Sequence, residues 1–177
     1  MTSIVSGSGA ARVTDDVRQA VLAISRRQDL NANSASGDDV VPFCVLKFVE
    51  GSESTLAIDI LSTLGDDKAD DHHQRVPSTW DQLVASLPRD QCRMALAQVP
   101  WTAHSDNVTR SRLVFILWAP SHGPSIKQRM TASMFSKGVE RMVEQWVGMP
   151  VRVEAAGVDD LELADVRDKI RSKATVK

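Results

Sequence analysis

The chain has 177 residues, of which 42% are hydrophobic and 25% are charged, and its formal net charge is −2. This composition is that of an ordinary globular domain and excludes a disordered or fibrous chain, while the length favours one domain with its own core. A nearly balanced charge offers no general attraction for nucleic acid, so we expect no such partner.

The apolar segments disfavour two further classes of protein. The longest apolar run, LVFILWAP at residues 113–120, is too short to span a bilayer, so we expect no transmembrane segment. The N-terminus lacks the basic start and apolar stretch of a signal peptide, which leads us to expect a cytoplasmic location. Cys44 and Cys92 lie in apolar, strand-like runs and are expected to be buried thiols without a disulfide.

The start of the chain predicts a flexible arm followed by a short amphipathic helix. Residues 1–13 are small and polar, as is typical of a terminal arm. Thr14 precedes two aspartates and is the expected N-cap of the helix, because acidic residues suit a first helical turn. The apolar residues that then recur at helical spacing are Val17, Ala20, Val21 and Ile24.

Two predicted strands follow, with a polar loop on either side. The loops are residues 30–39 and 64–76, which are polar and unpatterned. Between them, residues 43–49 and 55–61 are rich in β-formers and are separated by a turn at residues 50–52. This arrangement predicts a β-hairpin.

The middle of the chain predicts a second helix and two more strands. Ser78 is the expected N-cap of the helix, with Asp81 three residues later as in a capping box. Residues 92–99 alternate loosely, and residues 113–118 are continuously apolar, as in a central strand covered on both faces. The apolar stripe of this helix is formed by Trp80, Leu83, Val84 and Leu87.

The last third of the chain contains the longest helical pattern, which begins near Pro124 and stops at Gly148. Residues 151–155 predict a fifth strand, and a final helix is expected to begin at Asp159 or Asp160. The long helix is predicted to have one broad apolar face made of Ile126, Met130, Met134, Val139, Met142, Val143 and Trp146. Strands interspersed with helices in this order predict an α/β sandwich with a mixed sheet.

Three segments resemble a known family. Residues 79–93 (TWDQLVASLPRDQCR) have an aromatic-Asp helix start, a Leu-Pro end and a Cys-Arg strand start. Residues 110–120 (RSRLVFILWAP) enter an apolar strand through a basic-Ser-basic triplet and end in Trp-x-Pro. Residues 126–143 form a long helix with a basic-x-basic-Met start. In motif, order and spacing the chain resembles the actin-depolymerising factor (ADF)/cofilin family.

This resemblance implies a fold and a domain organisation. The fold is the ADF-homology, gelsolin-like α/β sandwich, with a five-stranded mixed sheet flanked by about four helices. A single ADF-homology domain is expected at residues 14–173, with loop insertions near 31–41 and 65–77. Residues 174–177 are expected to be a C-terminal tail.

The resemblance also implies a function. It predicts a monomeric protein without a cofactor that binds monomeric (G-) and filamentous (F-) actin and promotes filament disassembly, severing and turnover. Phosphoinositides are the other partner that it implies. Within the same fold, a glia-maturation-factor-like regulator of the Arp2/3 branch complex and a monomer-sequestering variant stay open. A small hydrolase or phosphotransferase is disfavoured, since the sequence has no Gly-rich phosphate loop, nucleophile elbow or Cys-x-x-Cys motif, and we expect no enzyme.

Contacts with the actin monomer are implied for the start of the long helix and for the N-terminal arm. Lys127, Arg129 and Met130 lie within one helical turn, so they can form an exposed ridge around a soft apolar contact. The alternative is that both cations are merely solvated and Met130 belongs to the core. Ser6 or Ser8 would be the regulatory phosphorylation site, because a phosphate adds negative charge to the arm. The implied monomer-binding set is Ser6, Ser8, Gly9, Lys127, Arg129, Met130, Ser133 and Lys137.

A second surface is implied for filaments. Arg110 and Arg112 face the same side of their strand, and the resemblance places them with Asp168, Lys169 and Arg171 against a second actin subunit. The alternative is that the two arginines only guard a strand end. The chain departs from the family pattern at residues 98–101, where Gln-Val-Pro-Trp replaces the usual Asp-Phe-Glu-Tyr.

One other cluster could suggest a metal site. His72 and His73 lie near four aspartates, Asp66, Asp67, Asp70 and Asp71. Adjacent histidines in a loop point apart, and the sequence offers no second ligand set. A solvated loop is therefore the favoured interpretation, and no metal is expected.

Overall fold

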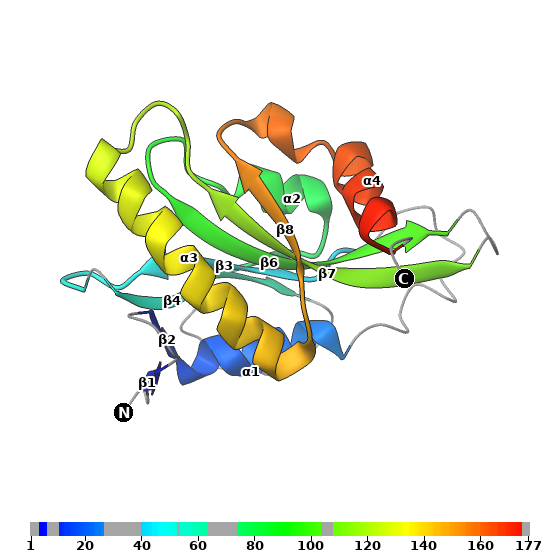
Figure 1. Cartoon of the computed structure of the whole chain (residues 1–177), viewed down its shortest axis with the longest axis horizontal. Coiled ribbons are helices and arrows are strands. Elements are labelled where there is room, and N and C mark those ends of the chain that lie inside the picture. The colour runs from blue at the N-terminus through cyan, green and yellow to red at the C-terminus, as the bar shows by residue number, and fades with distance from the viewer. Residues whose placement is uncertain are drawn as a thin grey trace.

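The computed structural model describes residues 4–6, 11–26, 40–52, 54–63, 74–103 and 108–174. Four α-helices and eight strands can be followed in this part of the chain (Figure 1). In chain order they are β1 (Ile4–Ser6), β2 (Arg12–Thr14), α1 (Asp15–Ser25), β3 (Phe43–Phe48), β4 (Thr55–Thr63), β5 (Gln74–Pro77), α2 (Trp80–Ala85), β6 (Arg93–Thr102), β7 (Thr109–Trp118), α3 (Ile126–Val147), β8 (Val151–Ala155), the 3-10 turn η1 (Val158–Leu161) and α4 (Leu163–Ala174).

The strands form one mixed sheet in the order β1-β2-β4-β3-β6-β7-β8, with β5 pairing to β4. Strands β3, β4, β6 and β7 are joined by antiparallel pairing, whereas β8 runs parallel to β7. The expected α/β sandwich with a mixed sheet is confirmed. Its five predicted strands are β3, β4, β6, β7 and β8, and the structure adds β1, β2 and β5 on one side.

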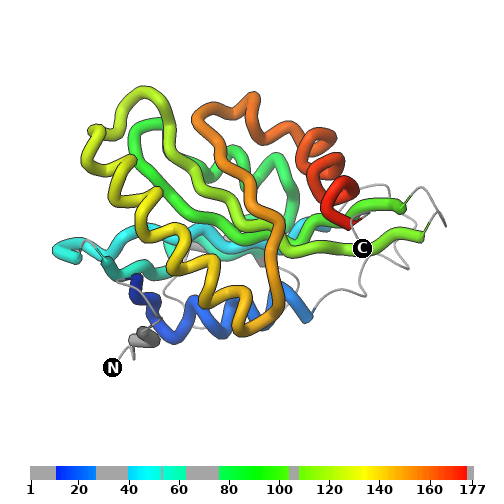
Figure 2. Tube along the Cα trace, viewed as in Figure 1, coloured from blue at the N-terminus to red at the C-terminus, as the bar shows by residue number. Residues whose placement is uncertain are grey.

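Helices α1 and α3 cover one face of the sheet, and α2 and α4 cover the other, as the trace in Figure 2 also shows. Residues 113–118 show why helices cover both faces of the sheet, because this part of β7 has apolar side chains on both faces. Leu113, Phe115 and Leu117 belong to the core under α1 and α3, while their neighbours at 114, 116 and 118 belong to the core under α2 and α4. A strand buried on both faces has no polar positions to alternate, as predicted.

The added strands correct two expectations about flexible segments. Residues 1–13 were expected to form an arm, but β1 and β2 pair antiparallel and β2 joins β4. Ala11 and Val13 are buried, so the packed fold begins before residue 14. In the same way, the end of the expected loop at 64–76 becomes strand β5. Its parallel pairing with β4 is non-local and leaves no local sequence signal. Most of the two expected insertions, namely residues 31–39 and 65–73, lies outside the described residues.

Helix starts were predicted within one or two residues in the middle of the chain but not at its end. The N-cap of α2 is Thr79, not Ser78, because the Thr79 hydroxyl accepts a hydrogen bond from the Gln82 amide at 3.2 Å. Near the C-terminus, the Asp160 carboxylate accepts from the amides of Ala156 and Gly157 at 2.8 and 3.1 Å. This aspartate therefore closes the separate turn η1, and α4 begins only at Leu163.

Both cysteines are free and buried, as expected. Burial raises the pKa of the Cys44 thiol to about 12. No helix in the described ranges is both long and apolar enough to cross a membrane.

Candidate functional site

The start of α3 is fixed by its own cap and by the loop before it. The Ser125 hydroxyl accepts from the Gln128 amide at 3.2 Å, and the Gln128 side chain accepts from the Ser125 amide at 2.7 Å, which completes a capping box. Gly123 has a φ of 101° and lies against the backbone of Asp90, where a Cβ would come within 2.6 Å of the Asp90 Cα. Only glycine fits that turn without strain.

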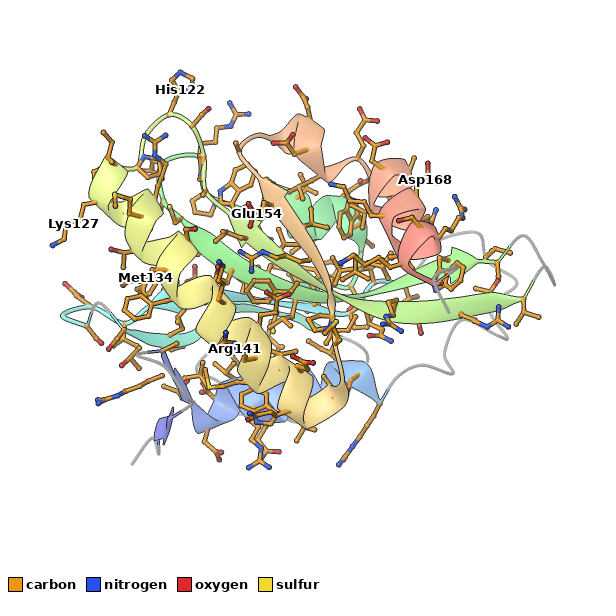
Figure 3. All side chains as sticks on the ribbon, viewed as in Figure 1. His122, Lys127, Met134, Arg141, Glu154 and Asp168 are labelled. Atoms are coloured by element: carbon orange, nitrogen blue, oxygen red, sulfur yellow. The ribbon has the colours of Figure 1, made fainter. Side chains whose placement is uncertain are left out.

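One face of α3 is exposed along most of the helix. Ile126, Met130 and Met134 are 69%, 67% and 64% exposed, and they follow one another at intervals of four residues. Figure 3 shows Lys127, Met134 and Arg141 along the same helix. We call this surface the α3 ridge; its exposed residues are Ile126, Lys127, Met130, Ser133, Met134, Lys137 and Arg141.

The single broad apolar face predicted for α3 is wrong. The helix buries Ala132, Phe135, Ser136, Val139, Met142 and Val143. An α-helix turns by about 100° per residue, so Met134 and Val139 differ by about 140° and cannot share a face. The helix therefore has two apolar stripes, and only one of them meets the sheet. The change of phase between Met134 and Val139 was visible in the sequence and could have revealed the ridge.

Arg129 differs from its neighbour Lys127. Lys127 is exposed, but Arg129 is only partly exposed, and its Nη1 donates a hydrogen bond to the Ser121 carbonyl at 2.8 Å. The expectation of two equivalent exposed cations is thus corrected: Arg129 ties the helix to the preceding loop.

An open groove of about 370 Å³ runs beside the α3 ridge. Among the described residues that line it are three cations, Lys47, Arg93 and Lys127. The Asp59 carboxylate forms ion pairs with Lys47 at 2.8 Å and with Arg93 at 2.9 Å. Burial by itself would raise the pKa of Asp59, but the hydrogen bonds and charges of the two cations together lower it.

Cys92 also lines this groove. Burial raises the pKa of the Cys92 thiol, and the charges of Arg129 and Arg93 offset that effect only in part. The thiol is therefore expected to stay protonated at neutral pH.

The middle of α3 is anchored on two sides. On one side, Gly138 lies so close to Ala11 that a Cβ at residue 138 would come within 2.8 Å of the Ala11 Cβ. On the other side, Arg152 of β8 donates to Glu140 at 2.7 Å and to the Ser136 hydroxyl at 2.8 Å. The ridge is thus presented on a helix whose position is fixed by the body of the protein.

The close contact at Gly138 also brings the N-terminal segment beside α3. Ser6 of β1 pairs with Arg12, the neighbour of Ala11. The backbone of Ser6 is thereby placed one strand away from the segment that contacts α3, whereas the predicted site residues Ser8 and Gly9 lie outside the described residues.

The second predicted surface lies at the other end of the molecule, where β6 ends and β7 begins beside α4 (Figure 1). Arg110 and Arg112 are exposed, and the Arg112 guanidinium donates to the Met149 carbonyl at 3.3 Å. On α4, Asp168 and Lys169 are exposed. Arg171 is partly buried; its Nε donates to the Thr102 carbonyl at 3.4 Å, and its Nη1 pairs with Asp168 at 2.5 Å.

The structure thus brings the predicted filament-binding residues to one end of the fold. A hollow of about 160 Å³ joins the two elements and is lined by Pro100, Trp101, Thr102, Thr109, Arg167 and Arg171. Arg167 was not predicted as a site residue. Its spacing of four residues from Arg171 was the available signal, because residues four apart share a helix face.

A mixed sheet between two helical layers, with one long helix that is buried on one side and exposed on the other, defines the class of ADF-homology domains. Residues 35–171 match the family model for cofilin/tropomyosin-type actin-binding proteins. The match covers well over half of the chain, so the chain belongs to this family. The expectation of a binding protein, not an enzyme, is thereby confirmed.

Plant proteins are among the similar curated sequences. Actin-depolymerizing factor 8 of Arabidopsis thaliana is 26% identical over 148 residues, which cover 78% of this chain and 98% of that protein. Actin-depolymerizing factor 3 of Zea mays is 29% identical over 145 residues, covering 79% and 99%.

Solved structures share the fold at lower identity. The crystal structure of Streptomyces griseoflavus cofilin is 18% identical with a TM-score of 0.56, covering 92% of this chain and 96% of that one. Human coactosin-like protein is 15% identical with a TM-score of 0.62, covering 95% and 93%. These similarities support the fold.

His72, His73 and the neighbouring aspartates, for which a solvated loop without metal is expected, lie outside the described residues. Within the described residues, no group of three or more potential metal ligands occurs.

Proposed function

We propose that this chain binds monomeric and filamentous actin and promotes filament disassembly and turnover. The observation that carries the proposal is the α3 ridge, with Ile126, Met130 and Met134 exposed in one line beside Lys127 and Lys137. Aligned apolar side chains in water are unusual in a monomeric protein and are typical of an interaction surface.

The chemistry of the ridge fits a helix that lies in a groove of its partner. Unbranched methionine side chains adapt to an irregular apolar surface, and the lysines at their border suit an acidic rim. The curated relatives are named for actin depolymerisation, which supports actin as the partner.

Filament activity requires a second contact. We assign it to Arg110, Arg112, Asp168, Lys169 and Arg171. In Figure 3, Asp168 of this set lies at the opposite end of the fold from Lys127. A protein that contacts two neighbouring subunits favours the filament geometry that satisfies both contacts. It thereby weakens the subunit contacts of the other geometry, which is a shift of populations.

A phosphate on Ser6 or Ser8 would switch the monomer contact off. The backbone at Ser6 pairs with Arg12, next to the contact between Ala11 and α3, and a phosphate adds roughly −1.5 to −2 charges there. Replacing both serines with glutamate should weaken monomer binding; unchanged affinity would exclude control through this arm. Phosphoinositides are the other ligand that we propose, and vesicles with and without these lipids test it by flotation.

Co-sedimentation with actin filaments tests the proposed function. We expect the protein to appear in the filament pellet and the amount of monomer in the supernatant to rise. Monomer release without pelleting would instead identify a monomer-sequestering protein. Absence of both effects would contradict the proposal and would favour the alternative in which the partner is the Arp2/3 branch complex.

A further inference from the structure

The end of strand β6 extends beyond its neighbour β3. The last pair of the β3–β6 ladder joins Phe43 to Ala97, and the Gln98 amide then donates to the Pro42 carbonyl at 2.9 Å. From Val99 to Thr102 the pairing continues only with β7, on the opposite side. One edge of this part of β6 therefore has no strand beside it in the described part of the chain.

The carbonyls at this open edge belong to Pro100 and Thr102. In an antiparallel strand the backbone groups of alternate residues point to the same side, so these two carbonyls face the same way as the paired amide of Gln98. Proline suits the position because it has no N–H to leave unpaired. The Gln-Val-Pro-Trp segment, which departs from the family pattern, thus creates an edge that offers acceptors.

Two arginines of α4 occupy this edge. Arg167 Nε donates to the Pro100 carbonyl at 3.0 Å, and Arg171 Nε donates to the Thr102 carbonyl at 3.4 Å. Residues four apart on a helix are separated by about 6 Å along its axis, and residues two apart on a strand by about 6.8 Å. The two spacings match closely enough for α4 to run along the edge of β6 and to take the place of a neighbouring strand.

The same segment carries the proposed filament surface. Arg110 stands directly opposite Trp101 in the β6–β7 ladder. Trp101 lies between Pro100 and Thr102, the two residues whose carbonyls accept from α4. Beyond β3 this hairpin end is a two-stranded ribbon, which is marginally stable without further packing. Asp168 and Lys169 lie between Arg167 and Arg171 on α4, so the two hydrogen bonds join both halves of the surface.

We propose that Arg167 is a positioning residue. Together with Arg171 it joins the end of the β6–β7 hairpin to α4 through the two hydrogen bonds to Pro100 and Thr102, which we call the clip. The clip holds Arg110 and Arg112 in a fixed arrangement with Asp168 and Lys169. The proposal rests on the proposed filament function. A surface that is already ordered binds its partner without the cost of ordering its side chains at the moment of binding.

The test compares Arg167→Ala with Lys173→Ala. The control removes the same charge from an exposed position in the last turn of α4. Arg167→Ala should weaken filament binding by about fivefold to tenfold, the effect of one or two side chains that must be ordered on binding, and should leave monomer affinity unchanged. Its amide hydrogens at the end of the β6–β7 ladder should also exchange faster than in the control. Arg167→Lys, which keeps one donor, should show a smaller change in both measurements.

Three results would overturn the proposal. The first is unchanged filament affinity in a folded Arg167→Ala variant, when replacement of Arg110 and Arg112 abolishes filament binding. Arg167 would then not position the filament surface, while the proposed function would stand. The second is faster exchange without any loss of filament affinity, because the clip then positions nothing. The third is an equal effect of Lys173→Ala.

If the unaltered protein fails to bind filaments, the proposed function fails. Unchanged amide exchange in Arg167→Ala would then still reject the clip. Should Arg167→Ala not fold, Arg167→Lys carries the same comparisons.

Discussion

Met130 is the residue whose environment decides most about this protein. It is 67% exposed, so the alternative in which Met130 belongs to the core is wrong. Ile126 and Met134, one turn away on either side, are exposed to a similar extent. Together they leave apolar surface in water that a partner can bury.

Met130→Ala should weaken binding to monomeric actin by about tenfold or more. Burying a methionine side chain contributes about 1.5–3 kcal/mol, and about 1.4 kcal/mol corresponds to a factor of ten. The melting temperature should stay the same, because the side chain packs against little of its own protein. Titration of labelled monomer against each variant measures the affinity, with Gln145→Ala on the exposed last turns of α3 as control. Unchanged affinity in Met130→Ala would remove the ridge from the interface.

Asp59 predicts how stability depends on pH. Its pKa is lowered in the folded protein, so its ion pairs contribute fully above its ordinary unfolded pKa. That contribution disappears as the pH falls through the lower, folded pKa. Asp59→Asn should therefore lower the free energy of unfolding at pH 7 by about 1–3 kcal/mol, because Arg93 and Lys47 lose their carboxylate partner.

Chemical denaturation at a series of pH values from 7 to 3 checks this expectation, with Asp81→Asn as an exposed control. The difference between the unaltered protein and Asp59→Asn should shrink as the solution becomes acidic. A difference that is constant over this range would show that the charge of Asp59 is not its source.

At the scale of elements, the position of α3 depends on contacts with two segments distant in sequence. Ala11 precedes β2 and touches the helix at Gly138, while Arg152 of β8 reaches Glu140 and also lies 5.7 Å from the centre of the Phe115 ring. Neither contact follows from the helical pattern of α3 itself. Both restrict the direction in which the ridge faces.

The contact between Gly138 and Ala11 predicts a coupling between two mutations. Gly138→Ala gains about 1 kcal/mol of helix propensity but places two Cβ atoms within 2.8 Å of each other. We expect a net loss of stability from this change alone, because overpacking typically costs about 1–3 kcal/mol. Adding Ala11→Gly should recover most of that loss. A double-mutant cycle by denaturation measures the coupling; independent, additive effects would mean that the N-terminal segment does not press on α3.

At the scale of the whole molecule, the two proposed surfaces lie at opposite ends. Figure 3 places Lys127 at one end and Asp168 at the other. The sheet between them is buried on both faces, so it separates the surfaces as a rigid body. A protein built in this way can lose one contact and keep the other.

Replacing Arg110 and Arg112 with alanine should spare monomer affinity and impair filament binding and severing. High salt should reproduce part of the effect, because exposed charges are screened over about 8–10 Å. Co-sedimentation and monomer titration on the same preparation provide the comparison, with Lys173→Ala as the charge control. Equal loss of both activities would place the pair in the monomer site. No loss of either would leave the two arginines as ordinary strand-end charges.

Much of the fold could be predicted from local patterns. The buried positions of α1, namely Val17, Ala20, Val21 and Ile24, are those that the helical spacing selected. Strands β3, β4, β6, β7 and β8 were also predicted, because apolar or β-rich runs have few alternatives in a protein of this length. Strands β1, β2 and β5 were not, because three or four residues become a strand only when a distant partner offers its edge.

The sequence by itself therefore determined the fold class, the five strands β3, β4, β6, β7 and β8 and, through three motifs, the family. Only the tertiary structure decided which apolar stripe of α3 meets the sheet and that Arg129 donates a hydrogen bond to the Ser121 carbonyl. It also decided that Arg167 and Arg171 donate to the carbonyls at the open edge of β6. The physical reason is the range of the interactions. Periodicity and capping act over a few residues, whereas the position of α3 and the partner of an unpaired carbonyl depend on segments distant in the chain. Ala11 lies beside Gly138, and Arg171 is 69 residues from Thr102.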